Sequence, residues 1–322
     1  MKNTLTEAVK IKIEEAESIS ILSHLNPDPD ALGTALGIYA CIKQDKRKKI
    51  EIVNGSKVLP KYLDFLPGYG KIKHQMEYSN SLIIACDCGS VDRLGFDLSG
   101  RDIINIDHHK SNTNYGSINV VVKEHVSSSQ VAYEVFKDFC NIEQDVATCF
   151  YTALLSDTRY FTTSNMNKEV FQLAYDLVDA GAKPEVVSFN LTQRRPLSSL
   201  RILERALESL TLYGDAKIAI LSITKQDILS TGATMPDVEG IVDYVRSLAT
   251  VEVAVFAMEL EDDIKFSLRS KKIDLTEIAM HFKGGGHSHA AGFTIKNSSL
   301  QESIDTILVK IKELGIVNEK KK

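Results

Sequence analysis

The sequence predicts an α/β protein in which a larger, N-terminal domain has a mostly parallel sheet flanked by helices. In the first half of the 322 residues, short apolar strands alternate with amphipathic helical stretches, a rhythm typical of parallel βαβ units. Beyond about residue 190 the order changes, and the mixture of strands and helices there predicts a smaller α+β domain. The composition, 43% hydrophobic and 25% charged, is that of a globular chain of about two domains.

The elements of the first domain follow from hydrophobic period and capping residues. A helix is expected over residues 4–15, because Thr4-Leu5-Thr6-Glu7 has the pattern of a capping box. The expected strands lie at 18–23, 49–53, 81–86, 102–106 and 117–122, and the further helices at 31–44, 129–139, 146–156 and 168–180. Because ligands bind at the carboxyl ends of parallel strands, a site is expected at that edge of the sheet.

The second half begins where Gly181 and Pro184 end this pattern. Arg194-Arg195-Pro196 precedes a helical run at 197–210 that we expect to connect the two domains. The smaller domain is expected to have strands at 217–223, 252–260, 264–270 and 292–295, with helices at 238–248, 275–281 and 299–314. The expected bounds are 1–190 for the larger domain, 191–212 for the connector and 213–322 for the smaller domain, across a cleft.

Composition and charge disfavour several classes of protein. No apolar run approaches the roughly 18 residues of a membrane span, and the N-terminus lacks the apolar region of a secretory signal, so we expect a cytoplasmic protein. Five cysteines at irregular spacing favour reduced thiols, and Cys86 and Cys88 are expected to pack in the core. A net charge of −5 disfavours binding to long duplex DNA, which needs a basic surface.

The loop after the first strand concentrates side chains that bind metals. In His24-Leu25-Asn26-Pro27-Asp28-Pro29-Asp30, an imidazole and two carboxylates lie between a strand and a helix, and two prolines stiffen the backbone. A purely structural interpretation is also open for this loop alone, because Asp30 can cap the following helix and His24 can end the strand.

Further predicted elements end in the same residue types. Asp87 follows the strand at 81–86, and Asp107-His108-His109 follow the strand at 102–106. Like charges converging on one sheet edge repel one another unless cations neutralise them. Asp157 ends the helix at 146–156, where the helix dipole disfavours a carboxylate that has no compensating cation.

These donors are carboxylates and imidazoles only. They are too many for one tetrahedral ion and suit two ions of higher coordination number, which favours Mn²⁺, with Mg²⁺, Co²⁺ or Fe²⁺ as substitutes. The candidate metal ligands are His24, Asp28, Asp30, Asp87, His108 and Asp157.

The order and spacing of these residues resemble a known family. The motif His24-x-x-Pro-Asp28-x-Asp30-x-x-Gly33, followed by Asp87, Asp107-His108-His109, Asp157 and Gly284-Gly285-Gly286-His287, is similar to that of the DHH/DHHA1 phosphoesterases. Within that family the chain most resembles the short, NrnA-like enzymes, which have a DHH catalytic domain and a DHHA1 substrate-binding domain. One position differs, because His289 stands where the family usually has Asn.

The resemblance implies a role for each motif residue. The implied ligands of one Mn²⁺ are His24 and Asp28, those of the other are Asp30, His108 and Asp157, and Asp87 bridges the two. His109 would face the substrate phosphate, with Asp107 behind it. The implied catalytic set is Asp87, Asp107, His108 and His109.

Recognition of the substrate is expected from the smaller domain. In the strand at 264–270 apolar and polar residues alternate, which puts Arg269 on the polar face, where it can hold a terminal phosphate. Without the resemblance, a solvated arginine would be the better interpretation. Gly284, Gly285 and Gly286 lack the Lys-Ser/Thr of a P-loop, but their backbone can approach a phosphate closely. With His287 these residues would form a positive wall for the substrate.

The implied activity is Mn²⁺-dependent hydrolysis of very short oligoribonucleotides (nanoRNA, such as pApA) to mononucleotides. The resemblance also implies dephosphorylation of nucleotide 3′,5′-bisphosphates such as pAp. Two-metal activation of a bridging water would supply the nucleophile. Domain closure about the connector would limit substrates to a few nucleotides. A homodimer is compatible with the sequence.

Four alternatives remain. A stand-alone cyclic di-AMP phosphodiesterase uses the same motifs, and the sequence does not separate it from an oligoribonuclease. A family II inorganic pyrophosphatase shares the first loop and the Asp-His-His motif but not the glycines at 284–286. A RecJ-type exonuclease is disfavoured by the acidic net charge, and a non-catalytic nucleotide-sensing module by the presence of all six candidate ligands.

Overall fold

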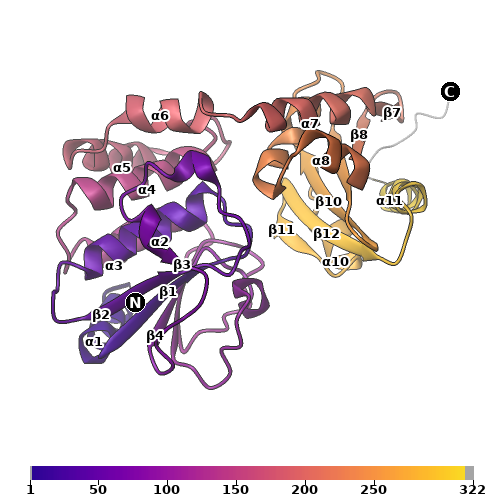
Figure 1. The fold of residues 1–322 in the computed structure, drawn as a ribbon. Helices are drawn as coiled ribbons and strands as arrows, with labels where there is room; N and C mark the ends of the chain where they lie inside the picture. Colours follow the sequence, from indigo (N-terminus) through magenta and orange to yellow (C-terminus); the bar gives the residue numbers. More distant parts are fainter. Residues whose placement is uncertain (1, 316–322) are drawn as a thin grey trace. The chain divides into compact units, whose positions relative to one another are not determined.

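The structure is a computed structural model that describes residues 2–315, apart from the side chains of Lys2, Asn3 and His287. It divides into two units, the first ending at Arg194 and the second beginning at Arg195 (Figure 1). None of the helices in the described residues has the length and apolar character that crossing a membrane requires.

The first unit contains a six-stranded sheet in which every neighbouring pair of strands is parallel. Its strands are β1 (Ser18–Ser23), β2 (Lys49–Val53), β3 (Ile72–Lys73), β4 (Leu82–Cys86), β5 (Ile103–Asp107) and β6 (Ile118–Val121). The spatial order is β3-β2-β1-β4-β5-β6, so the chain builds outward in one direction from β1 and in the other from β4. The predicted parallel sheet is confirmed, and β1 and β4 flank the switch point at which such sheets bind ligands.

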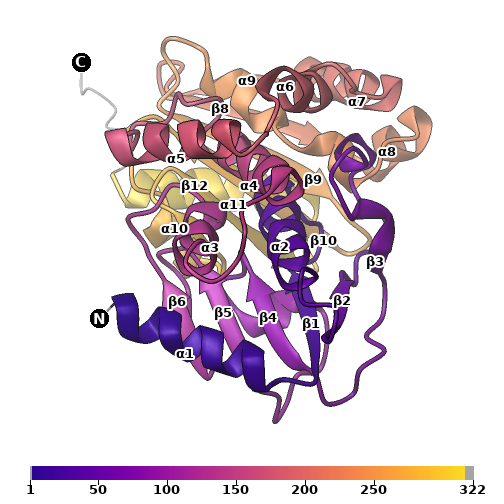
Figure 2. The ribbon, with the colours of Figure 1, turned by 90° about the vertical axis from the view of Figure 1, so that its left-hand side faces the viewer.

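Helices cover one face of this sheet in layers (Figure 2). They are α1 (Lys2–Glu15), α2 (Pro29–Ile42), α3 (Ser128–Phe136), α4 (Gln144–Asp157), α5 (Lys168–Asp179) and α6 (Pro184–Thr192). α2 and α3 pack on the strands, α4 packs on α2, and α5 and α6 pack on α4. The opposite face is covered by the connection from β4 to β5, whose Leu94 and Leu98 are buried together with Ile83 of β4.

Two glycines allow α2 and α4 to approach closely. A Cβ at Gly33 would lie 2.6 Å from the carbonyl oxygen of Cys149, and a Cβ at Gly37 would lie 2.3 Å from a ring carbon in α4. Side chains at these positions would push the two helices apart. Because Asp30 and Asp157 belong to α2 and α4, this contact also fixes the distance between two candidate metal ligands.

We expect Gly33→Ala to destabilise the protein, because the added methyl group would meet backbone of α4 that cannot move aside by itself. Overpacking of this kind costs about 1–3 kcal/mol in the free energy of unfolding, which urea denaturation followed by circular dichroism measures. Gly70→Ala is the control, since a Cβ at Gly70 meets nothing within 4 Å. An unchanged urea midpoint for Gly33→Ala would show that α2 and α4 separate without cost.

The second unit is an α+β domain, as predicted. Its strands are β7 (Thr211–Tyr213), β8 (Ile218–Ile223), β9 (Val253–Glu259), β10 (Asp263–Ser270), β11 (Gly285–His287) and β12 (Ala290–Lys296). Its helices are α7 (Leu197–Glu208), α8 (Lys225–Thr231), α9 (Ile241–Arg246), α10 (Thr276–His281) and α11 (Leu300–Glu313). The sheet order is β11-β12-β10-β9-β8-β7, and only β8 and β9 are parallel neighbours.

Both faces of this second sheet are covered by helices. α10 and α11 bury one face around Phe266, and α7, α8 and α9 bury the other around Phe256. α7, which the sequence suggested as a connector, packs on β8 and α8 within this unit.

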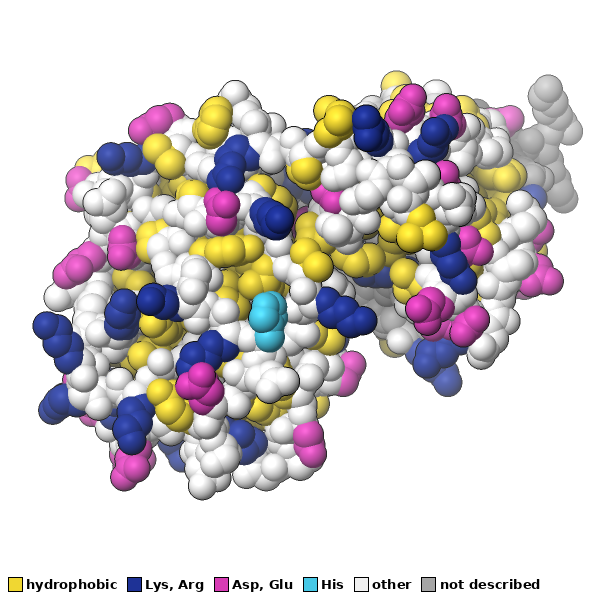
Figure 3. All heavy atoms as spheres, viewed as in Figure 1, with side chains coloured by type: hydrophobic (Ala, Val, Ile, Leu, Met, Phe, Trp, Pro, Cys, Tyr) yellow, Lys and Arg dark blue, Asp and Glu magenta, His cyan; other side chains and the backbone are white. Residues whose placement is uncertain are grey.

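On the face drawn in Figure 3, positive and negative side chains are interspersed rather than gathered in one basic stripe.

The start of α2 differs from its predicted start at Ala31. Asp28, and not Asp30, is the N-cap, because Asp28 Oδ1 accepts a hydrogen bond from the Ala31 N–H at 2.9 Å. Pro29 then occupies the first helical position, where its missing N–H costs nothing. The five cysteines are free thiols, and Cys86 and Cys88 are fully buried, as predicted.

Candidate metal centre

The carboxyl ends of the central strands carry the residues that the sequence analysis singled out. His24 follows β1, Asp87 follows β4, and Asp107 ends β5 with His108 and His109 directly after it. Because β1, β4 and β5 are parallel neighbours, these residues meet at the switch point of the sheet. Three groups have ligand atoms within 4.8 Å of one another: His24–Asp28–Asp87, Asp30–His108–Asp157 and Asp87–His108–His109.

In the first group, which we call the His24 cluster, one imidazole faces two carboxylates. His24 Nε2 lies 3.6 Å from Asp87 Oδ2 and 3.9 Å from Asp28 Oδ2. His24 Nδ1 lies 2.8 Å from the carbonyl oxygen of Leu25, and since a carbonyl only accepts, Nδ1 is the donor. In the neutral ring Nε2 therefore has the free lone pair that a metal ligand needs.

We call the group of Asp30, His108 and Asp157 the His108 cluster. In this cluster, too, one imidazole faces carboxylates. His108 Nε2 lies 3.4 Å from Asp157 Oδ2, 3.6 Å from Asp30 Oδ2 and 3.6 Å from Asp87 Oδ1. His108 Nδ1 donates to the carbonyl oxygen of His125 at 3.1 Å, which again leaves Nε2 facing the carboxylates. One imidazole N–H cannot serve three carboxylates, whereas one cation can bind all of them.

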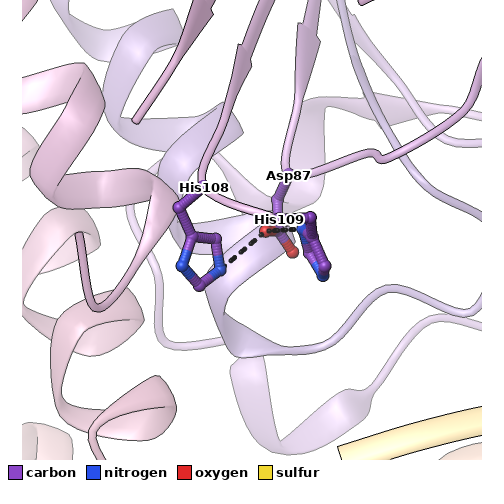
Figure 4. Close-up of side chains that lie close together, drawn as sticks. All are labelled: Asp87, His108 and His109. Atoms are coloured by element: carbon purple, nitrogen blue, oxygen red, sulfur yellow. Dashed lines mark ion pairs between the residues drawn. The ribbon is translucent and has the colours of Figure 1, made fainter. Parts of the chain in front are cut away.

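Asp87 is part of the His24 cluster and also lies beside the His108 cluster. Its Oδ2 faces His24 and its Oδ1 faces His108, and Figure 4 shows the carboxylate between the rings of His108 and His109. The backbone of Asp87 is left-handed, with φ 53°. That conformation costs an L-residue about 1–2 kcal/mol, and such strain persists where the surrounding structure holds it, often at functional sites.

Asp107 lies behind His109 rather than in either cluster. Its Oδ1 accepts hydrogen bonds from His109 Nδ1 at 2.7 Å and from the His108 N–H at 2.8 Å, and its Oδ2 accepts one from the side chain of Asn112. Burial alone would lower the pKa of His109, but Asp87 and Asp107 raise it to about 9. In the metal-free protein these two carboxylates therefore favour the charged form of His109.

Burial and mutual repulsion act on the clustered carboxylates. Burial, Asp87 and Asp157 raise the pKa of Asp30 well above its ordinary value, and burial with Asp87 raises the pKa of Asp157 to about 6. Asp87 is the exception, since His109 and His24 outweigh its burial and lower its pKa. The oxygen and imidazole donors and their crowded negative charge fit a pair of divalent cations.

The polar groups that hold these ligands were not predicted from the sequence. The hydroxyl groups of Ser127 and Ser128, at the start of α3, donate to Asp30 and Asp87. Asn112 holds Asp107 from the loop after β5. The run of three serines before an apolar helix was the available signal for the first pair, because serine favours helix starts.

Apart from His109, the candidate substrate residues lie in the second unit. The alternation of β10 is as predicted, with Arg269 on the more exposed face. Its side chain is 25% exposed, its Nε lies 4.0 Å from Asp243 Oδ2, and one of its terminal nitrogens donates to the Leu268 carbonyl. His289, where the resemblance leads one to expect Asn, donates from Nδ1 to the carbonyl oxygen of Ile273 at 3.2 Å.

Gly284 and Gly286 have a packing role that does not depend on any ligand. β11 pairs with β12 so closely that a Cβ at Gly284 would lie 2.2 Å from the Gly292 carbonyl oxygen, and one at Gly286 would lie 2.3 Å from the Ala290 carbonyl oxygen. Gly285 pairs with Gly292 in the same ladder. The side chain of His287 lies outside the described part of the structure.

Relatives and one solved structure are similar to this chain over most of its length. The bifunctional oligoribonuclease and PAP phosphatase NrnA of Thermus thermophilus is 28% identical, with 92% of this chain and 89% of that protein covered. The cyclic-di-AMP phosphodiesterase PdeA of Listeria monocytogenes is 24% identical over 93% of this chain, which spans 48% of PdeA. The crystal structure of an exopolyphosphatase-related protein from Bacteroides fragilis is 25% identical, with 97% of each chain covered and a TM-score of 0.84.

Domain families match both units. Residues 18–154 match the DHH family, N-terminal domain, and residues 215–314 match the DHHA1 domain. The first match spans the strands whose carboxyl ends carry His24, Asp87 and His108, and the second spans β8 to β12. Because the two domains occur in the order that the motifs predicted, the chain belongs to the DHH/DHHA1 family of phosphoesterases.

Proposed function

We propose that this protein is a Mn²⁺-dependent hydrolase that cleaves very short oligoribonucleotides such as pApA to mononucleotides. We also propose that it dephosphorylates nucleotide 3′,5′-bisphosphates such as pAp. The observation that carries the proposal is that the Asp87 carboxylate lies between the His24 and His108 clusters, because two adjacent cations suit attack on a phosphate. The likeness to the NrnA protein over 92% of this chain supports the substrate class.

The proposed roles follow the two clusters. His24 and Asp28 would hold one ion, Asp30, His108 and Asp157 the other, and Asp87 both. When bound, two Mn²⁺ ions would supply an activated water and neutralise charge on the phosphate, with Mg²⁺ or Co²⁺ as substitutes.

His109 is proposed to contact the substrate phosphate directly. Asp107 accepts from His109 Nδ1 and so fixes the ring, and a protonated ring is a charged donor of the kind that phosphate oxygens accept. In the second unit, the substrate-binding roles proposed for Arg269, residues 284–286 and His287 rest on the family motif.

We expect Arg269→Ala to raise the KM for pApA about 10-fold or more, since the loss of a charge-assisted contact to phosphate has this size. An arginine that holds only a terminal phosphate binds ground and transition states alike, so kcat should change less than KM. Steady-state kinetics measure both constants. Asp243→Asn is the control, because it disrupts the neighbouring carboxylate and keeps the arginine. A fall in kcat at unchanged KM would contradict the role.

A second candidate function is cleavage of cyclic di-AMP. The likeness to the PdeA protein over 93% of this chain favours it, and the same two clusters would serve the same bond cleavage. The two functions differ in whether the substrate has a free terminal phosphate, which only the linear substrates present to Arg269.

A substrate panel tests the proposal. The purified chain is incubated under Mn²⁺ with pApA, longer oligoribonucleotides, pAp, cyclic di-AMP or pyrophosphate, and the release of nucleotides and phosphate is measured. We expect turnover of pApA and pAp, slower turnover of longer chains, and loss of all turnover with a chelator. Preference for cyclic di-AMP would favour the second candidate, and turnover of pyrophosphate alone would overturn both.

We further propose a cytoplasmic location, consistent with five free thiols, and action as a monomer or homodimer. Sedimentation at the concentration of the activity assay distinguishes these two states.

A further inference from the structure

The segment 125–129, which leads into α3 and forms its first turn, contacts the candidate ligands around His108. The His125 carbonyl oxygen accepts from His108 Nδ1 at 3.1 Å. Ser127 Oγ donates to Asp30 Oδ1 at 2.7 Å, and the Ser128 N–H donates to Asp30 Oδ2 at 2.9 Å. Ser128 Oγ donates to Asp87 Oδ1 at 2.8 Å. With a longer bond from the Ser129 N–H to Asp30 Oδ1 at 3.4 Å, five hydrogen bonds from one short segment therefore act on three candidate ligands.

These contacts are shielded from water. Ser127 and Ser128 are fully buried, and Asp30 and Asp87 are almost so. A buried carboxylate cannot exchange a lost partner for solvent, so each hydroxyl contributes more to orientation here than on the surface. The amino end of α3 also points its positive dipole at Asp30.

The His24 cluster lacks this support. Asp28 Oδ1 accepts from the Ala31 N–H of its own helix, and the Asp28 side chain is 42% exposed. His24 Nδ1 donates to the carbonyl of the next residue. Asp87 reflects the same asymmetry, because the oxygen that receives the Ser128 hydroxyl is Oδ1, which faces His108, and not Oδ2, which faces His24.

We propose that segment 125–129 is a positioning element for the His108 cluster, and that this cluster therefore binds its divalent cation more tightly and earlier than the His24 cluster. Ligands held in place by further hydrogen bonds lose less freedom when a cation binds, and removing such a partner weakens metal affinity by about 10- to 100-fold. The proposal rests on the proposed function only in that both clusters must bind a metal.

The experiment is a Mn²⁺ titration of the full-length protein without substrate, followed by calorimetry and electron paramagnetic resonance. The wild type should bind two ions in two steps of different affinity. Asp28→Asn should weaken the looser step, because it removes a ligand of the His24 cluster only. Ser128→Ala should weaken the tighter step about 10-fold or more and change the looser step less than about twofold. Ser128→Thr retains the hydroxyl and should restore most of the affinity.

Ser20→Ala is the matched control. The Ser20 hydroxyl is also fully buried and donates to a buried carboxylate, Glu51 Oε1, at 2.7 Å, but it lies inside β1 and away from both clusters. It should lower stability and leave both Mn²⁺ steps unchanged. If Ser128→Ala does not fold, Ser127→Gly replaces it, since glycine is tolerated at a helix N-cap and removes the hydroxyl that faces Asp30.

The outcomes separate this inference from the proposed function. If the wild type binds both ions with one affinity, or if Ser128→Ala leaves both steps unchanged, the positioning role is wrong while hydrolysis of pApA by the wild type still supports the function. Equal weakening of both steps would also contradict a role confined to one cluster. If the wild type binds no Mn²⁺ and hydrolyses none of the substrates, the function itself is wrong.

Discussion

Asp87→Asn should abolish Mn²⁺-dependent hydrolysis of pApA. Asp87 gives one oxygen to each cluster, so the amide removes the negative charge from both candidate ion sites and leaves a ligand oxygen for only one of them. The loss of turnover should be about 100-fold or more, since losing a partner that only supports a metal ligand already costs about 10- to 100-fold. Asn is the suitable replacement because it tolerates the left-handed backbone at this position.

The control for this variant is Asp102→Asn. Asp102 lies just before β5, at the opposite end of the strand from the clusters, and pairs with Lys12 at 2.6 Å. Its loss should change stability slightly and leave kcat for pApA unchanged. Near wild-type turnover by Asp87→Asn, measured by release of mononucleotides at saturating Mn²⁺, would exclude the shared carboxylate as the centre of the reaction.

The parts of the fold that the sequence predicted well are those with a strong local signal. β1 and β2 have the predicted bounds, because in each of them polar residues alternate with isoleucines over a short run, which is the period of a strand. β3 has only two residues, and β11 consists of two glycines and a histidine, so neither carries a strand signal of its own. β11 forms because the edge of β12 offers it hydrogen bonds.

Two helices were missed for different reasons. A proline usually indicates the end of a helix. Pro184 is instead the first residue of α6, and proline is favoured at the first position of a helix. α8 has a capping box from Thr224 to Asp227, but its seven residues are too few to show a helical period.

The candidate ligands were predictable because the end of a parallel strand has a known location in the fold. His24, Asp87 and His108 needed only the assumption that their strands are parallel neighbours. The residues that hold them were not predictable in this way. Ser128 lies 41 residues from Asp87 and 98 residues from Asp30, and its contacts depend on where α3 packs, which no local pattern encodes.

Mn²⁺ should raise the melting temperature of the protein more at pH 8 than at pH 5. Without metal, Asp157 has its pKa raised to about 6 from an ordinary value near 3.8, and the pKa of Asp30 is raised in the same direction. Between those values the folded protein holds more protons than the unfolded chain, so stability falls as the pH rises through about 4 to 6. The stability falls because the ionised forms of Asp30 and Asp157 are unfavourable in the folded protein.

His24 and His109 also make the folded protein less stable as the pH rises, but over a higher pH range. The pKa of His109 is raised to about 9 and that of His24 is also raised, so the stability that their charged forms contribute is lost as the pH rises through about 6.5 to 9. Asp87 opposes this trend only in acid. Because its pKa is lowered in the fold, the protein loses stability as the pH falls below about 3.8, the ordinary pKa of an aspartate. The metal-free protein should therefore become less stable from pH 5 to pH 8.

Divalent cations reverse this trend because they bind the deprotonated ligands and compete with protons. At Mn²⁺ about 100-fold above its dissociation constant, binding contributes about 2.7 kcal/mol, or about 5–10 °C for a unit of this size. We expect that shift at pH 8 and less than half of it at pH 5, measured by differential scanning fluorimetry. Asp87→Asn should lose most of the shift at both pH values, while Asp102→Asn should keep it. Equal or greater stabilisation at pH 5 would mean that the clustered carboxylates and imidazoles do not bind the cation.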